Sequence, residues 1–281
     1  MFDRRNSSSN VELRRANIMN DINRTHNELE QRELQHNGIT KERKNRCILL
    51  VGLSKTGKTT LMRVLADPQH VPNEPSLRVS SATTPSCYED VCANSTTISL
   101  TVVELPSTMI DSNSDLSNIN KECARLGIDN FHLICFCTTI DIGIRDQDVH
   151  AFERFLNHFG KEKISSNLCM IITRFESKTD EERRRLRDEL MNDAHFRNLT
   201  KWLKQGIHFS GALNYDDWRR ANDSLCDQFE SVYNYRKDLL ALIESDIQPF
   251  YLQPIQPKKK APLPAPIQSN VKAPLSRSIP V

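Results

Sequence analysis

The residues best suited to chemistry lie at Gly52–Thr60, where the chain reads GLSKTGKTT directly after the apolar run CILLV. This is a complete GxxxxGK[ST] phosphate-binding loop (P-loop), set between a buried strand and the start of a helix. Backbone N–H groups of the loop and of the helix N-terminus favour an anion there. We expect Lys58 to contact the β- and γ-phosphates of a nucleotide, and the Thr59 hydroxyl to coordinate Mg²⁺. The expected nucleotide contacts of this loop are Gly52, Ser54, Lys55, Thr56, Gly57, Lys58, Thr59 and Thr60.

Two further segments could complete the metal end of that site. The loop SSATTPSCYED holds Thr83 and Thr84, either of which could be a switch threonine that senses Mg²⁺ and the γ-phosphate. An ordinary Ser/Thr-rich loop would look the same. The segment Glu104-Leu-Pro-Ser107 stands where GTPases carry Asp-x-x-Gly. Glu104 is one methylene longer than aspartate, and Ser107 has less backbone freedom than glycine. The expected metal ligands are Thr59, Thr84 and Glu104.

A base-recognition site is expected where two later strand candidates end. Thr173-Arg174-Phe175-Glu176 occupies the place of the guanine-reading [NT]KxD, where Glu176 could accept from guanine N1 and N2 and Arg174 could stack on the base. A strand that turns into a charged helix explains this segment almost as well. The turn Ser210-Gly211-Ala212 could present amides to guanine O6. The expected base contacts are Thr173, Arg174, Glu176, Ser210, Gly211 and Ala212.

The elements that must position these residues alternate between apolar strands and helical segments, which is typical of a parallel sheet covered by helices. The strand candidates are CILLVG, TTISLTVVEL, FHLICFCTT, NLCMIIT and GIHFSG. Helices are expected at 58–65, around the 3.6-period stripe 149–159, at 181–191 and, as one long closing helix, at 218–243. The pattern predicts an α/β fold with three layers and a mostly parallel central sheet.

Polar tails flank this centre. Residues 1–43 are Asn-, Arg- and Glu-rich with one weak apolar stripe, and we expect a solvated helix or disorder rather than a coiled coil. Residues 246–281 hold eight of the thirteen prolines and are expected to be disordered. Neither tail is expected to contribute to the core. The nucleotide-binding domain should therefore occupy residues 44–245.

Charge and composition exclude several classes of protein. Residues 1–44 carry nine Lys/Arg against seven Asp/Glu and residues 248–281 carry five against none, so the centre is net negative although the whole chain is +2. A basic nucleic-acid-binding face is therefore not expected. The sequence contains neither a long apolar run nor a secretory signal at its start, which indicates a cytoplasmic protein. The eight cysteines lack CxxC pairs and should be free thiols.

Taken in order, VGLSKTGKTT, ATTPSCYED, VVELPS, IRDQDVHAFERFLNHFGKEK, MIITRFE and FSGAL resemble the GTPases of immunity-associated proteins, an AIG-type group allied to chloroplast import GTPases and septins. The resemblance covers roughly residues 44–245, and its most specific piece is the helix that ends in NHFGKEK. It implies a P-loop GTPase domain that binds GTP or GDP with Mg²⁺. By this resemblance, Lys58 and Thr59 are expected to be the phosphate and Mg²⁺ residues and Thr84 the switch threonine. Arg174 and Glu176 are expected to be the base-recognition pair. Glu104 and Ser107 depart from the family's Asp-x-Pro-Gly.

Three hypotheses about function follow. The first is a guanine-nucleotide switch with slow or assembly-dependent GTP hydrolysis, for which the resemblance implies a nucleotide-dependent homodimer or oligomer. The second is an ATP-using P-loop enzyme, which TRFE and FSGAL disfavour. The third is a nucleotide-holding scaffold without turnover, which the altered ELPS keeps open. No catalytic residue is assigned. The Pro/Lys-rich tail could dock weakly on a proline-reading protein module or an anionic membrane.

Overall fold

The computed structural model describes residues 4–37, 44–73, 86–88, 98–111, 114–139, 145–194 and 196–253. Its centre is a six-stranded sheet in the order β2-β3-β1-β5-β6-β7. The strands are β1 Lys44–Val51, β2 Ser86–Tyr88, β3 Ile98–Glu104, β5 Leu133–Thr139, β6 Leu168–Thr173 and β7 Ile207–Phe209. All neighbouring pairs are parallel except β2 and β3, which are antiparallel at one edge. The five expected strand segments are therefore confirmed, and β2 is an addition.

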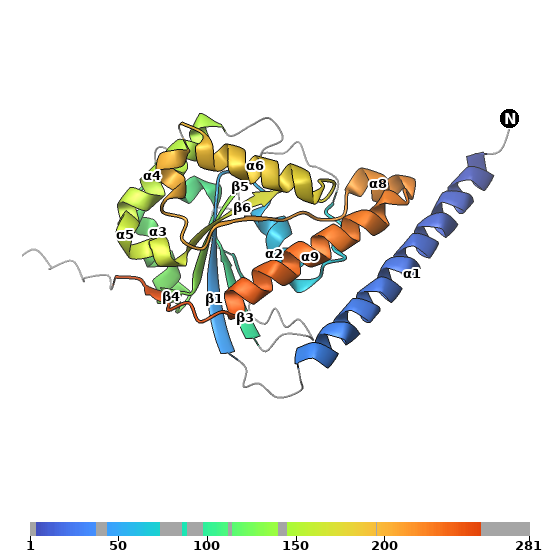
Figure 1. The fold of residues 1–281 in the computed structure, drawn as a ribbon, viewed down its shortest axis with the longest axis horizontal. Coiled ribbons are helices and arrows are strands. Elements are labelled where there is room, and N and C mark those ends of the chain that lie inside the picture. The colour runs from blue at the N-terminus through green and yellow to red at the C-terminus, as the bar shows by residue number, and fades with distance from the viewer. Residues whose placement is uncertain are drawn as a thin grey trace, which may run out of the picture.

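Helices cover both faces of this sheet, as the sequence pattern predicts (Figure 1). Successive residues of a strand point to opposite faces, so Leu49 and Val51 belong to one core cluster and Ile48 and Leu50 to the other. The first cluster is packed by α3 Ser117–Arg125, α4 Asp146–Phe159, α5 Lys161–Ile164, α6 Asp180–Asn192 and α7 Arg197–Thr200. The second is packed by α2 Lys58–Ala66 and α9 Ser224–Glu244. The three-layer α/β fold is confirmed.

The N-terminal segment forms one long helix, α1 Arg4–Asn37, which lies beside α9 and runs in the same direction (Figure 1). Its Ile18 and Ile22 are buried in a cluster with Leu225 and Phe229 of α9. The expectation that this segment contributes nothing to the core is therefore wrong. The sequence stripe looked too weak to build a core because its partner, a second apolar face on α9, is about 200 residues away along the chain.

The expected helix 218–243 is divided in two by the structure. Helix α8 Tyr215–Arg220 ends at Ala221, whose φ of +53° lies in the left-handed region, and α9 begins three residues later. Asn222 supports the break, since its side-chain oxygen accepts a hydrogen bond from the backbone N–H of Ser224. The apolar periodicity continues across this turn and therefore conceals it.

The last described residues also pack on the domain. Strand β8 Phe250–Tyr251 pairs with β4 Asn130–Phe131 in a separate two-stranded sheet. The Asn167 side chain, in the 3₁₀ helix η2 Ser165–Asn167, donates to the carbonyl of Gln248 at 2.6 Å. The expected start of the tail at residue 246 is therefore too early. The remaining part of that tail, 254–281, lies outside the described residues.

The described cysteines are free thiols, as expected. Cys135, Cys137 and Cys169 are fully buried on β5 and β6, and the Sγ atoms of Cys135 and Cys169 lie 3.6 Å apart. Within the parts of the chain that the structure describes, every helix is too short or too polar to cross a lipid bilayer.

Candidate nucleotide site

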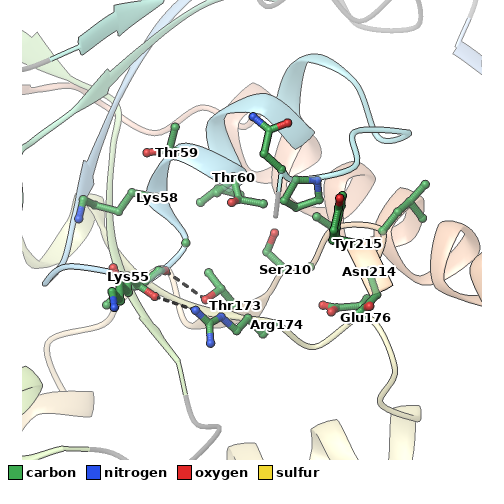
Figure 2. A pocket seen from close by; sticks show the side chains of 18 of the residues that line it. Lys55, Lys58, Thr59, Thr60, Thr173, Arg174, Glu176, Ser210, Asn214 and Tyr215 are labelled. Carbon is green, nitrogen blue, oxygen red and sulfur yellow. Dashed lines mark hydrogen bonds between the residues drawn. The ribbon is translucent and has the colours of Figure 1, made fainter. Parts of the chain in front are cut away.

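A cavity of about 710 Å³ lies at the carboxyl ends of the parallel strands, where open α/β sheets place their ligands. It gathers residues from the P-loop, from the end of β3 and from the segments that follow β6 and β7. Figure 2 shows Lys58 and Thr59 at one end and Glu176, Asn214 and Tyr215 at the other. The expected residues that line it are Lys55, Thr56, Gly57, Lys58, Thr59, Thr60, Glu104, Thr173, Arg174, Glu176, Ser210, Gly211 and Ala212.

The backbone of the P-loop is held close to the sheet. A Cβ at Gly52 would lie 2.4 Å from the carbonyl oxygen of Cys137, so only glycine fits against β5. Gly57 has a φ of +77°, and a Cβ there would be 3.0 Å from Thr173 Oγ1. The Thr173 hydroxyl can donate to the carbonyl of Thr56 at 3.1 Å. These contacts explain why the motif needs both glycines, and they assign Thr173 to the shape of the loop.

Lys58 carries its charge into the interior of this loop. The side chain is buried, and Nζ donates to the carbonyls of Gly52 at 2.7 Å and Leu53 at 2.9 Å. Burial lowers the pKa of Lys58, and the negative charge of Glu104 partly opposes that shift. A desolvated ammonium group gains from an anion placed beside it, because the attraction is screened less than it would be in water.

The donor set at the other side of the P-loop suits Mg²⁺. Thr59 Oγ1 donates to the Glu104 carboxylate, at 2.7 Å from Oε1 and 2.9 Å from Oε2. Adjacent ligands of an octahedral Mg²⁺ with bonds of 2.0–2.1 Å stand about 2.9 Å apart. A hydroxyl and a carboxylate at this separation are therefore spaced as two neighbouring oxygen ligands. The extra methylene of Glu104 does not take its carboxylate away from Thr59. The third expected ligand, Thr84, lies outside the described residues.

The segment after Glu104 is fixed by a residue that the sequence analysis did not find. Ser107 begins a short 3₁₀ helix, η1 Ser107–Met109, and the chain then turns past Ile110. Arg154 of α4 donates to the carbonyls of Ile110, Asp111 and Ser114, the last at 2.9 Å. Three carbonyls on one guanidinium tie this segment to the domain. Arg154 lies in the middle of an ordinary helical stripe, and its spacing gives no sign of this role.

The two segments expected to recognise the base contact each other directly. The backbone N–H of Phe175 donates to the carbonyl of Ser210 at 3.1 Å. A Cβ at Gly211 would lie 2.5 Å from Glu176 Oε2 and 2.8 Å from the Glu176 backbone nitrogen, so the glycine leaves room for this carboxylate. Arg174, with a φ of +62°, donates to the carbonyl of Lys55 at 3.3 Å (Figure 2). The two expected halves of the base site are thus brought together, and Arg174 joins them to the P-loop.

Some outcomes differ from the expected set. Gly52 shapes the P-loop without lining the cavity, and Ser54 is exposed outside it. The structure adds Leu61 on α2 and Leu213 at the end of FSGAL to the expected contacts. It also adds lining residues on two segments that the motifs did not include: Pro72, Asn73, Asn214, Tyr215 and Asp216. Asn214 caps α8 by accepting from the backbone N–H groups of Asp216 and Asp217. The run NYDD has the composition of a helix start, and that signal could have pointed to this turn.

Comparison with known proteins gives remote likenesses. No protein-family model matches the sequence, and no curated protein matches it. The crystal structure of Toc33 from Arabidopsis thaliana in complex with GDP and Mg²⁺ has a TM-score of 0.46 and 12% identity, over 74% of this chain and 88% of that one. Toc33 with Mg²⁺ and GMPPNP has a TM-score of 0.45 and 11% identity, over 84% and 96%.

A third structure is translation elongation factor SelB from Methanococcus maripaludis, in complex with the GTP analogue GPPNHP. Its TM-score is 0.40 and its identity 15%, over 72% of this chain and 34% of that chain. Likenesses at this level are too remote to assign a family or a ligand. The assignment of function therefore depends on the residues of this chain.

Proposed function

We propose that the protein binds GTP and GDP with Mg²⁺ in this cavity. The observation that carries the proposal is the meeting, in one space of about 710 Å³, of the P-loop lysine, the Thr59–Glu104 pair and the Glu176–Gly211 contact. That volume lies within the ~300–1,000 Å³ of ordinary small-molecule sites. Lys58 binds the phosphates, and Thr59 and Glu104 would hold Mg²⁺, which neutralises phosphate charge when bound.

Guanine is the base that this site favours. The Glu176 carboxylate accepts hydrogen bonds only, and guanine offers donors at N1 and N2 on one edge. Adenine has no donor at N1, so it would leave a buried acceptor without its bond, and such losses are costly. Arg174 lies beside the P-loop backbone, where its planar guanidinium group can stack on the base.

Slow GTP hydrolysis that depends on assembly is the second element of the proposal. Turnover needs a positioned water and positive charge delivered to the γ-phosphate. Ser107 replaces the expected glycine, and no glutamine follows it in ELPSTMID. A second copy of the chain could supply the missing charge across a two-fold interface. The AIG-type resemblance of the motifs supports such a homodimer.

A nucleotide-holding scaffold without turnover is the alternative, and one observation favours it. The segment after Glu104 is tied to α4 by three carbonyl contacts of Arg154. A segment held in this way is less free to rearrange around a γ-phosphate. A single-turnover assay at several protein concentrations separates the two functions. Phosphate release that accelerates with concentration supports assembly-coupled hydrolysis, whereas an absence of release at every concentration supports the scaffold.

Binding is tested by calorimetry with GTP, GDP and ATP, with and without Mg²⁺. We expect Lys58→Ala to weaken GDP binding at least about 30-fold, since truncating one partner of a buried charge pair costs about 2–5 kcal/mol. Lys121→Ala, on the exposed part of α3 and outside the cavity, is the control and should bind normally. Equal binding by Lys58→Ala, or ATP binding as tight as GTP binding, would refute the proposal.

A further inference from the structure

Helix α1 reaches the base end of the cavity through Arg15. Its Nε donates to the carbonyl of Trp218 at 2.9 Å, and its Nη2 donates to the carbonyl of Arg219 at 2.7 Å. The same guanidinium group lies over the indole ring of Trp218, 4.4 Å from its centre. One side chain of α1 thus fixes both the ring of Trp218 and the end of helix α8.

Trp218 in turn supports a wall of the cavity. Its ring is stacked with that of Tyr215, at 6.0 Å between centroids and 29° between planes. Tyr215 lines the cavity on the side of Glu176 (Figure 2). Arg15, Trp218 and Tyr215 therefore form a continuous stack that begins on α1 and ends at the cavity.

Two other contacts connect α1 with this end of the cavity. Ile18 and Ile22 share a buried cluster with Leu213, which also lines the cavity. On the segment that follows α2, the side-chain amide of Gln69 lies 2.9 Å from Nδ1 of His26 of α1. This segment continues into Pro72, another lining residue. Helix α1 thus contacts both chain segments that bring lining residues from outside the expected set of nucleotide contacts.

We propose that α1 is a structural part of the nucleotide site, in which Arg15 is a positioning residue for Tyr215 and for the loop that follows β7. The inference rests on the proposed function, and it deepens that function by assigning the support of this cavity wall to α1. Two groups that order the same wall stabilise each other. A nucleotide that contacts Tyr215 therefore strengthens the packing of α1, and packed α1 strengthens nucleotide binding by the same factor. This linkage is specific to ligands that carry a base.

The sequence offers a matched pair of variants for the test. Arg15→Ala removes the stack and two carbonyl contacts, whereas Arg14→Ala removes the same charge one residue earlier. Arg14 contacts Asp223, with both side chains largely exposed, and such pairs contribute little. In the full-length chain with Mg²⁺, we expect Arg15→Ala to weaken GDP binding about 5- to 150-fold. Arg14→Ala should bind GDP like the unaltered protein, and inorganic tripolyphosphate should bind equally to both variants.

Hydrogen exchange at the amides of residues 15–26 supplies a second measurement. GDP should slow this exchange in the unaltered chain and in Arg14→Ala, and tripolyphosphate should not. Arg15→Lys keeps the charge but lacks the planar fork and should fall between the two variants. Equal GDP affinities for Arg14→Ala and Arg15→Ala would overturn this inference but not the proposed function. The same holds if GDP does not change the hydrogen-exchange rate in α1. Failure of the unaltered chain to bind GDP would instead overturn the proposed function.

Discussion

At the scale of single residues, the proposed base preference depends on the contact between Gly211 and Glu176. We predict that Gly211→Ala displaces Glu176, because the new Cβ would lie 2.5 Å from its carboxylate and 2.8 Å from its backbone nitrogen. Overpacking of this kind costs about 1–3 kcal/mol, so GDP affinity should fall about 5- to 150-fold. Competition between GDP and ADP measures the effect.

Gly127→Ala is the control for this experiment. Gly127 has a φ of +73°, and a Cβ there meets nothing within 4 Å. This variant should lose some stability through backbone strain and keep the base preference intact. A preference for GDP that survives in Gly211→Ala would show that Glu176 does not read the base.

Glu104 provides a test of the metal end. We predict that Glu104→Gln, which keeps the shape and removes the charge, reduces the gain in GDP affinity on adding Mg²⁺ about tenfold. Hydrogen bonds to charged groups are worth about 1.5–3 kcal/mol, and we expect the loss of a charged metal ligand to cost a similar amount. Binding in EDTA should be unchanged, because the P-loop contacts remain. If both proteins gain equally from Mg²⁺, Glu104 is not a metal ligand.

Motifs in the sequence located residues that line the cavity where the backbone needs particular residue types along a short segment. The P-loop, Thr173 and the turn at Ser210–Ala212 were found because the backbone needs their types at fixed spacing. Arg15, Arg154 and Tyr215 were missed for the opposite reason. Arg15 and Arg154 act through contacts 40 or more residues away in the sequence, which local patterns do not show. Tyr215 lies in a cavity wall that only the fold assembles, although the helix-start composition of NYDD marks its turn.

At the scale of elements, the contact between α4 and the segment after β3 should stabilise that segment locally. We predict that Arg154→Ala speeds hydrogen exchange at the amides of Ile110, Asp111 and Ser114 by at least about tenfold, because each bond from a charged group is worth about 1.5–3 kcal/mol. The matched control is Arg185→Ala on α6, whose partner is the exposed Glu189. Unchanged exchange in Arg154→Ala would mean that the segment holds its own shape.

The order of elements could be predicted because strands buried on both faces read as continuous apolar runs. The boundaries of the elements were harder to predict from the sequence. The break at Ala221 and the pairing of β8 with β4 depend on contacts that local periodicity does not encode. The largest difference between prediction and structure is helix α1. Its sequence is mostly polar, and one face becomes buried only because α9 packs against it.

At the scale of the whole molecule, the end of the domain can be located by shortening the chain. A chain that stops at Gln253 should melt at the temperature of the full-length protein. A chain that stops at Ser245 loses β8, the Asn167–Gln248 bond and the packing of Phe250 on Phe159. We expect about 2 kcal/mol of lost stability and a melting temperature lower by about 4–8 °C. Identical melting of the two chains would restore the earlier boundary.

The rate at which the buried cysteines of β5 and β6 are alkylated can report on the stability of the sheet. A hydrogen bond with Cys169 and burial raise the pKa of the Cys135 thiol, and burial raises that of Cys137. Only a thiolate that meets solvent reacts with an alkylating reagent. In a chain whose other five cysteines are serine, alkylation therefore depends on how often the centre of the sheet opens. A bound nucleotide should slow it in proportion to its occupancy, so the protein reports its own ligand without an added dye.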